Sequence, residues 1–236
     1  MAGLYIILMG VQGSGKGVQA AFIRDHYGIP HVSTGDLFRA MKTRTDSLAQ
    51  QIQEIMKSGQ LVSDEITNAV VQERLEQPDA AKGAILDGYP RSPGQAQWLE
   101  SYLQSRGESL TAVLLLDLDL YQAFRRAFGR VTSASGESYN IYSNSDGIEW
   151  AFVEDANKQY PPRLEATLKA TGEKLIRRAD DASAHAIIQR IDTYLQTTQP
   201  LIEYFESKGL VQRVDASKPI ESVSREIEQV IASVRS

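Results

Sequence analysis

The fold is decided by the stretch LYIILMGVQGSGKGV at residues 4–18, which joins an apolar run to a glycine-rich turn. The apolar run stops at Gly10 and predicts a strand that is buried on both faces of a parallel sheet. Gly10, Gly15 and Lys16 then have the spacing of a phosphate-binding loop, in which backbone N–H groups surround an anion and the lysine reaches the outer phosphates. The residues that follow predict a helix, whose N-terminal dipole would face the same phosphates.

The glycines of this turn allow positive φ angles and keep Cβ atoms away from phosphate oxygens. One position departs from the general pattern, because Gly17 stands where Ser or Thr would supply a hydroxyl group to Mg²⁺. A glycine-rich turn that binds nothing is the alternative interpretation. The order of strand, turn, lysine and helix favours the phosphate-binding loop.

The composition limits the class of protein. With 236 residues, of which 42 per cent are hydrophobic, the chain can bury a sizeable core in one domain with inserts or in two domains. A formal net charge of -5 argues against a general surface for nucleic acid or anionic membranes. The absence of cysteine excludes disulfides and thiolate zinc sites. The sequence predicts neither a signal peptide nor a membrane span, so we expect a cytoplasmic protein, and we expect it to be a monomer.

Apolar periodicity predicts three short helices with no strand between them, from about residue 34 to residue 71. Further strands are predicted at 83–87, 112–118 and 210–214, and further helices at 120–128 and 221–234. The first of these strands ends in Asp87, which places a carboxylate at the carboxyl edge of the sheet, where doubly wound folds bind ligands. Residues 131–176 are polar and too numerous for a simple loop, so they predict a second insert.

Six motifs along the chain match one family in the same order. They are GVQGSGKG at 10–17, STGDLFR at 33–39, GQLV at 59–62, DGYPR at 87–91 with Gln95, TGE at 171–173 and RADD at 178–181. Together they span most of the chain, and in them the sequence resembles adenylate kinases of the long, lid-bearing type.

The resemblance implies an α/β P-loop fold of three layers around a five-stranded parallel sheet. It implies a core of residues 1–33, 64–130 and 178–236, a helical insert for the nucleoside monophosphate at 34–63, and a lid at 131–177. It also implies the reaction, the reversible Mg-dependent transfer of a phosphoryl group from ATP to AMP, which gives two ADP. Such a transfer needs alignment and many cations but no nucleophile on the protein.

The resemblance also implies a role for each matching residue. The catalytic cations would be Lys16, Arg91, Arg130, Arg178 and Arg190. ATP would bind Gly13, Ser14, Gly15, Lys16, Gly17 and Val18, with Arg126 and Lys218. AMP would bind Thr34, Arg39, Val62, Gly88, Arg91 and Gln95, the last because an amide can pair with a base edge. Asp87 would hold Mg²⁺ through water, and Asp180 and Asp181 would help to close the lid.

Some positions depart from the family pattern. The family usually has Pro at the place of Gln12 and Thr at the place of Val18, so the loop loses a rigid φ angle and a hydroxyl group. Gln189 competes with Arg190 for the last arginine position. Two alternatives therefore stay open, a kinase of the UMP/CMP type and a nucleotide-binding module with weak or no turnover. Gln95 favours AMP as the acceptor.

The lid is expected to contain no zinc. Related lids often hold zinc with four cysteines, but the first two matching positions here are Thr132 and Ser135. Residues 131–176 contain neither Cys nor His, and structural zinc needs thiolate or imidazole ligands. We therefore expect hydrogen bonds among Thr132, Ser133, Ser135 and Tyr139, with apolar packing that uses Trp150 and Phe152, to hold the lid together.

Overall fold

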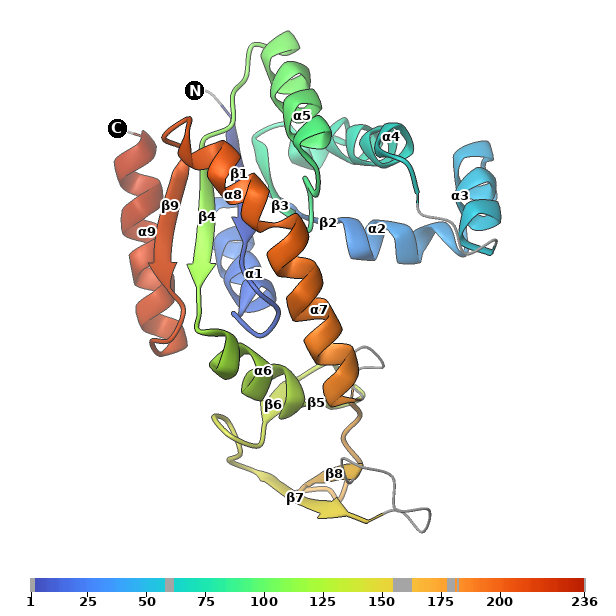
Figure 1. Cartoon of the computed structure of the whole chain (residues 1–236), viewed down its shortest axis with the longest axis vertical. Helices are drawn as coiled ribbons and strands as arrows, with labels where there is room; N and C mark the ends of the chain where they lie inside the picture. Colours follow the sequence, from blue (N-terminus) through green and yellow to red (C-terminus); the bar gives the residue numbers. More distant parts are fainter. Residues whose placement is uncertain (1–2, 58–61, 155–162, 178–180, 182, 236) are drawn as a thin grey trace. The chain divides into compact units, whose positions relative to one another are not determined.

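The computed structural model describes residues 3–57, 62–154, 163–177, 181 and 183–235 (Figure 1). The chain forms two compact units, one of residues 1–10, 15–117 and 195–236, the other of residues 11–14 and 118–194. The tip of the glycine-rich turn therefore belongs to the second unit, and Lys16 belongs to the first. The expected lid at 131–177 falls within the second unit, while the boundaries of the three expected domains remain predictions.

A five-stranded parallel sheet organises the first unit. Its strand order is β2 (His31–Ser33), β3 (Gly83–Asp87), β1 (Leu4–Met9), β4 (Ala112–Asp117) and β9 (Val211–Asp215). Every residue of β1 is buried, as its continuous apolar run predicted. Leu8 and Ser33 both pair with Asp87, so these three strands end together at the carboxyl edge of the sheet. The predicted α/β fold with a five-stranded parallel sheet is confirmed.

Helices pack on this sheet and on one another (Figure 1). Helix α1 (Lys16–Tyr27) contacts α9 (Ile220–Arg235) and strands β1, β2 and β3. Helix α5 (Pro93–Ser105) contacts α4 (Asp64–Leu75) and α8 (Gln199–Glu206). A short 3-10 helix, η1 (Pro78–Ala80), precedes β3, and α7 (Ala184–Thr197) begins in the second unit and ends in the first.

Three short helices follow β2, as predicted: α2 (Thr34–Met41), α3 (Ser47–Lys57) and α4. Ser33 and Ser63 cap α2 and α4, because each Oγ accepts a hydrogen bond of 3.4 Å from the backbone N–H three residues later. A separate apolar cluster joins the three helices, with Met41, Ala49, Ile52 and Val70 at its centre and Leu37, Phe38, Leu48 and Ile66 around them. These helices thus have a small core of their own.

The second unit joins α6 (Leu120–Phe128) to two antiparallel strand pairs. Strand β5 (Arg130–Thr132) pairs with β6 (Ser138–Asn140), and β7 (Ile148–Val153) pairs with β8 (Arg163–Leu168) (Figure 1). Its apolar core consists of Val131, Ile141, Ile148, Leu164, Ala166 and Leu175. Of the expected polar contacts, Ser133 Oγ lies 2.7 Å from Ser135 Oγ. The sequence did not predict these strands, only an insert.

Trp150 and Phe152 lie at the edge of that core instead of inside it. Their rings meet edge to face with centroids 5.7 Å apart, yet the two residues are 42% and 40% exposed. The residues opposite them on β8, Ala166 and Leu164, are buried and occupy the core themselves.

Among the helices that the structure describes, none is long and apolar enough to cross a membrane.

Candidate functional site

The glycine-rich turn has the backbone of an anion-binding loop. Gly15 has a φ of 92° and stands at the N-cap of α1, so the first N–H groups of that helix point out of its end. Lys16 Nζ donates to Gly10 O at 2.5 Å, which folds the lysine back along the turn. Gly17 and Val18 are exposed at the start of α1. The helix dipole and the ammonium group together make the end of α1 electropositive.

The tip of the turn packs on α6. Gly13 has a φ of 86°, and a Cβ atom there would lie 2.6 Å from the carbonyl oxygen of Ala123 and 3.3 Å from Arg126 Cβ. Gln12 Nε2 donates to Ile187 O at 3.3 Å, so the residue that departs from the family pattern anchors the tip to α7. Glycine is therefore required at position 13 both by conformation and by space.

Ser14 supplies an observation that points to a ligand. Its hydroxyl oxygen is buried and has no hydrogen-bond partner among the residues that the structure describes. Buried polar groups are rarely left unpaired, and a hydroxyl group can donate to an anionic oxygen. A phosphate oxygen at the turn would satisfy it.

A second group of residues meets where β2 and β3 end. Thr34 Oγ1 donates to Gly88 O at 2.8 Å, and Arg91 Nε donates to the same carbonyl at 2.8 Å. Arg91 Nη2 lies 3.4 Å from Thr34 Oγ1, and Gly88 has a φ of 72°. Desolvation lowers the pKa of the Arg91 guanidinium, and the Asp87 carboxylate partly offsets this. Thr34, Gly88 and Arg91, which the resemblance assigned to AMP, thus lie together.

The Asp87 side chain faces β2. Its Oδ2 lies 3.2 Å from His31 Nε2, and both side chains are largely buried. The sequence analysis assigned no role to His31, although its place two residues before Ser33 on the neighbouring strand is the signal that would have found this contact. Arg39 Nη2, on α2, donates to Asp36 Oδ1 at 2.5 Å, and Val62 lies just before α4.

Gln95 is only 4% exposed, and its amide is bound at both ends. The oxygen accepts from the Arg91 backbone N–H at 2.7 Å, and the nitrogen donates to Asp64 Oδ1 at 2.6 Å. The sequence analysis assigned no site role to Asp64. The Asp64–Gln95 contact joins residues that are 31 positions apart and lie on two different helices, so no local sequence pattern predicts it.

In the second unit, a buried carboxylate holds two arginines. Asp181 is fully buried; its Oδ2 accepts from Arg130 Nε at 3.0 Å and from Arg130 Nη2, and its Oδ1 accepts from Arg190 Nη1 at 3.0 Å. Arg190, and not Gln189, therefore stands beside Asp181. The other two residues that the resemblance assigned here, Arg178 and Asp180, lie outside the described residues.

Arg177 was missed by the sequence analysis. Its Nη2 donates to Phe128 O at 2.9 Å and to Asp181 O at 2.6 Å, and its guanidinium lies 4.7 Å from the centroid of the Phe128 ring. Desolvation lowers its pKa, as it does for Arg126 on α6. The contact joins the segment that follows β8 to the end of α6.

Lys218 is engaged with carboxylates of its own unit. Its Nζ donates to Glu226 Oε2 at 2.7 Å and lies 3.9 Å from Asp215 Oδ2. These ion pairs raise its pKa, with the hydrogen bond to Glu226 as the main cause. An ATP contact by Lys218 would compete with them.

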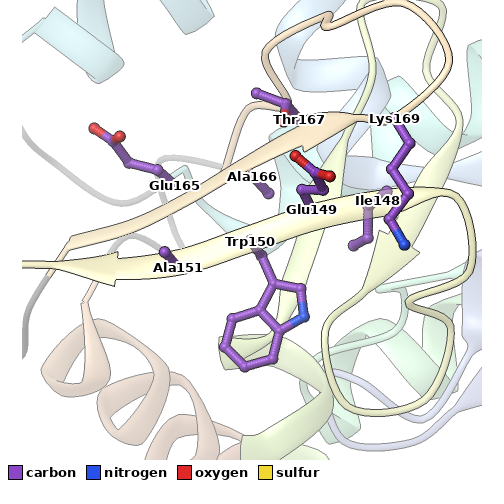
Figure 2. Close-up of a pocket in the computed structure, with 8 residues that line it drawn as sticks. All are labelled: Ile148, Glu149, Trp150, Ala151, Glu165, Ala166, Thr167 and Lys169. Carbon is purple, nitrogen blue, oxygen red and sulfur yellow. The ribbon is translucent and has the colours of Figure 1, made fainter.

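The β7–β8 hairpin also carries a shallow pocket, shown in Figure 2. Its lining consists of Ile148, Glu149, Trp150, Ala151, Glu165, Ala166, Thr167 and Lys169. The Trp150 ring points away from Glu149 and Glu165, as the alternation of a strand requires (Figure 2). Two carboxylates and one ammonium group are a poor lining for a triphosphate, and no residue predicted for the site lies here.

Comparison with known proteins gives a consistent result. The sequence profile of the adenylate kinase family matches residues 8–210. A protein described as "Adenylate kinase" from Caldanaerobacter subterraneus subsp. tengcongensis is 36% identical over 231 residues, which cover 98% of this chain and 97% of the relative. Proteins of the same description from Thermotoga neapolitana and Nitrosococcus oceani are each 38% identical, over 96% and 97% of this chain and over 96% and 99% of their own lengths.

Proposed function

Since the chain belongs to the adenylate kinase family, we propose that it transfers the γ-phosphoryl group of Mg·ATP to AMP with the cations described above. It is a nucleoside monophosphate kinase, and the reaction of adenylate kinases gives two ADP. The observation that carries the residue roles is the glycine-rich turn, with Lys16 folded along it. At its tip lies the buried hydroxyl group of Ser14, to which no residue in the described part of the chain forms a hydrogen bond.

On the donor side, ATP phosphates bind the backbone N–H groups of residues 13–18, while Lys16 leaves Gly10 O and contacts the β- and γ-oxygens. Ser14 Oγ donates to one of these oxygens. Arg126 stacks on the donor adenine, since a planar guanidinium packs well on an aromatic face. Val18 offers only its backbone, so one phosphate contact that a hydroxyl group would make is absent.

On the acceptor side, Arg91 and Arg39 bind the AMP phosphate, because guanidinium groups pair with phosphate oxygens through two parallel hydrogen bonds. Arg91 is already held beside Gly88 and Thr34, so little of its conformational freedom remains to be lost on binding. Gln95 faces the adenine. Since its side chain is nearly buried, the residues that cover it must move when AMP binds, and we expect the insert at 34–63 to do so.

Arg130 and Arg190 stabilise the charge that develops on the transferring phosphoryl group. Asp181 holds both guanidinium groups, so they are oriented before the nucleotides arrive. Arg178 would belong to the same set. Such preorganisation matters because cations that must first be assembled contribute less to the rate.

Adenylate kinases generally use Mg²⁺, and the residues at the end of β3 fit it. Asp87 offers a carboxylate, the kind of oxygen ligand that Mg²⁺ prefers, and Asp87 Oδ1 has no hydrogen-bond partner among the described residues. Binding through water agrees with the missing hydroxyl group at position 17. When bound, the ion neutralises charge on the β- and γ-phosphates.

The test replaces Lys16 by alanine and measures ADP formation from ATP and AMP. We expect kcat/KM to fall at least about a hundredfold. The melting temperature should change little, since Lys16 is only partly buried and lies outside the apolar core. Lys82→Ala is the matched control, because Lys82 is an exposed lysine just before β3. Wild-type turnover by the Lys16→Ala variant would contradict the proposed mechanism.

A further inference from the structure

Asp64 and the backbone of Arg91 determine which way round the Gln95 amide lies. Asp64 Oδ1 accepts from Gln95 Nε2 at 2.6 Å, and the Arg91 N–H donates to Gln95 Oε1 at 2.7 Å. An ionised carboxylate can only accept hydrogen bonds, and a backbone N–H can only donate one. The chemistry of the two partners therefore fixes the orientation of the amide.

Turning the amide over would break both contacts. Oε1 would then face a carboxylate oxygen, and Nε2 would face an N–H group, so each buried group would lose its partner. A buried polar group without a partner loses the hydrogen bonds that it would make with water in the unfolded chain and gains none in return. The reversed amide is thus strongly disfavoured in this environment.

Asp64 is itself held in place. Its Oδ2 accepts from Ser92 Oγ at 2.5 Å, and Ser92 Oγ in turn accepts from the Gln95 backbone N–H at 3.1 Å. Asp64, Ser92 and Gln95 therefore form a closed ring of hydrogen bonds between the first turns of α4 and α5. A carboxylate at the first position of α4 is also favoured by the helix dipole.

The bound amide retains one N–H and one carbonyl lone pair, since an amide has four hydrogen-bond positions and the described residues form only these two hydrogen bonds with it. The 6-amino group of adenine is a donor and the ring nitrogen beside it is an acceptor, so an amide of fixed orientation can pair with both. In hypoxanthine an oxygen replaces the amino group and accepts instead. Adenine and hypoxanthine thus need opposite arrangements of donor and acceptor on the Gln95 amide.

We propose that Asp64 is a positioning residue that sets the base specificity of the acceptor site through Gln95, so that a 6-aminopurine monophosphate is accepted and a 6-oxopurine monophosphate is rejected. This rests on the proposed function, in which Gln95 faces the acceptor base. It adds a determinant that does not itself touch the base. Sites that fix the order of donor and acceptor discriminate strongly, because the wrong partner leaves buried groups unpaired.

The experiment measures kcat/KM for AMP and for inosine monophosphate in the wild-type enzyme and in Asp64→Asn. Asparagine offers both a donor and an acceptor, so it tolerates either orientation of the Gln95 amide. We expect the ratio of AMP to inosine monophosphate to fall about tenfold, through the KM of the monophosphate and with the KM of ATP unchanged. Glu65→Gln removes a carboxylate from the same helix turn, where Glu65 is exposed, and should leave the ratio unchanged.

An unchanged ratio in Asp64→Asn would overturn the proposal. If that variant does not fold, Ser92→Ala is the second test. It removes the hydrogen bond that holds Asp64 but keeps the carboxylate charge, and it should also lower the ratio of AMP to inosine monophosphate. An unchanged ratio in Ser92→Ala would likewise overturn the proposal. Gln95→Leu separates this failure from that of the proposed function. If Gln95→Leu leaves the KM of AMP unchanged, Gln95 does not face the base, and the proposed acceptor site is wrong. If Gln95→Leu raises the KM of AMP but Asp64→Asn leaves the ratio unchanged, only the role of Asp64 is wrong.

Discussion

Gly13 lies at the tip of the phosphate-binding loop, where an added Cβ would meet α6. We predict that Gly13→Ala destabilises the protein by about 1–3 kcal/mol, because its φ is positive and the added Cβ would lie 2.6 Å from Ala123 O. Denaturant unfolding measures the effect. Gly17→Ala is the control for stability, since a Cβ at position 17 would meet no atom within 4 Å. Equal stability of the two variants would show that the tip of the loop does not pack on α6.

Asp181 is the residue on which the arginine pair depends. Replacing it by asparagine removes the charge that holds Arg130 and Arg190, and we predict that kcat falls about a hundredfold, because misplaced cations no longer meet the transition state. Steady-state kinetics at a temperature where the variant is folded provides the measurement. Asp192→Asn, at an exposed position of α7, should retain wild-type kcat. A wild-type kcat in Asp181→Asn would mean that the arginines are positioned by something else.

At the scale of elements, the hairpin β7–β8 shows how the second unit is held together. Its buried side chains belong to the cluster of six aliphatic residues that includes Leu164. We predict that Leu164→Ala destabilises this unit by about 2–5 kcal/mol, which hydrogen exchange of the β7 and β8 amides would report. Val153→Ala removes an exposed side chain of the same hairpin and should cost no more than about 0.5 kcal/mol.

Apolar packing of this kind stabilises the two hairpins without a bound metal ion. A zinc-selective chelator should therefore leave the amide protection of β7 and β8 unchanged, and elemental analysis should find no stoichiometric zinc. Protection that collapses on chelation, or survives Leu164→Ala unchanged, would contradict packing as the source of stability.

Across the whole molecule, the elements that were predicted from the sequence share one property. Each is encoded by a short, continuous stretch of residues. Strands β1, β3 and β4 are continuous apolar runs, and the phosphate-binding loop is a contiguous motif. Strands β7 and β8 were not predicted, since β7 is mostly exposed and pairs with β8, a strand that is separated from it in the sequence. These two strands therefore depend on their pairing with each other, and the hydropathy pattern of neither stretch alone predicts a strand.

The candidate site divides in the same way. Thr34, Gly88 and Arg91 follow strand ends, and parallel strands bring their ends together, so their meeting could be predicted. The contacts of Asp64 with Gln95 and of Arg177 with the Phe128 carbonyl could not, because each joins different elements through a side chain whose partner is distant in sequence. Such contacts depend on tertiary packing, which no short stretch of sequence encodes.

In the proposed reaction, one chain moves a phosphoryl group directly from ATP to AMP. The most direct measurement follows ATP, AMP and ADP together over time with the purified protein and Mg²⁺. We predict that each AMP consumed yields two ADP and that no free phosphate accumulates, because the γ-phosphoryl group passes to AMP and not to water. ATP loss with AMP unconsumed, or faster transfer to UMP or CMP than to AMP, would contradict the account.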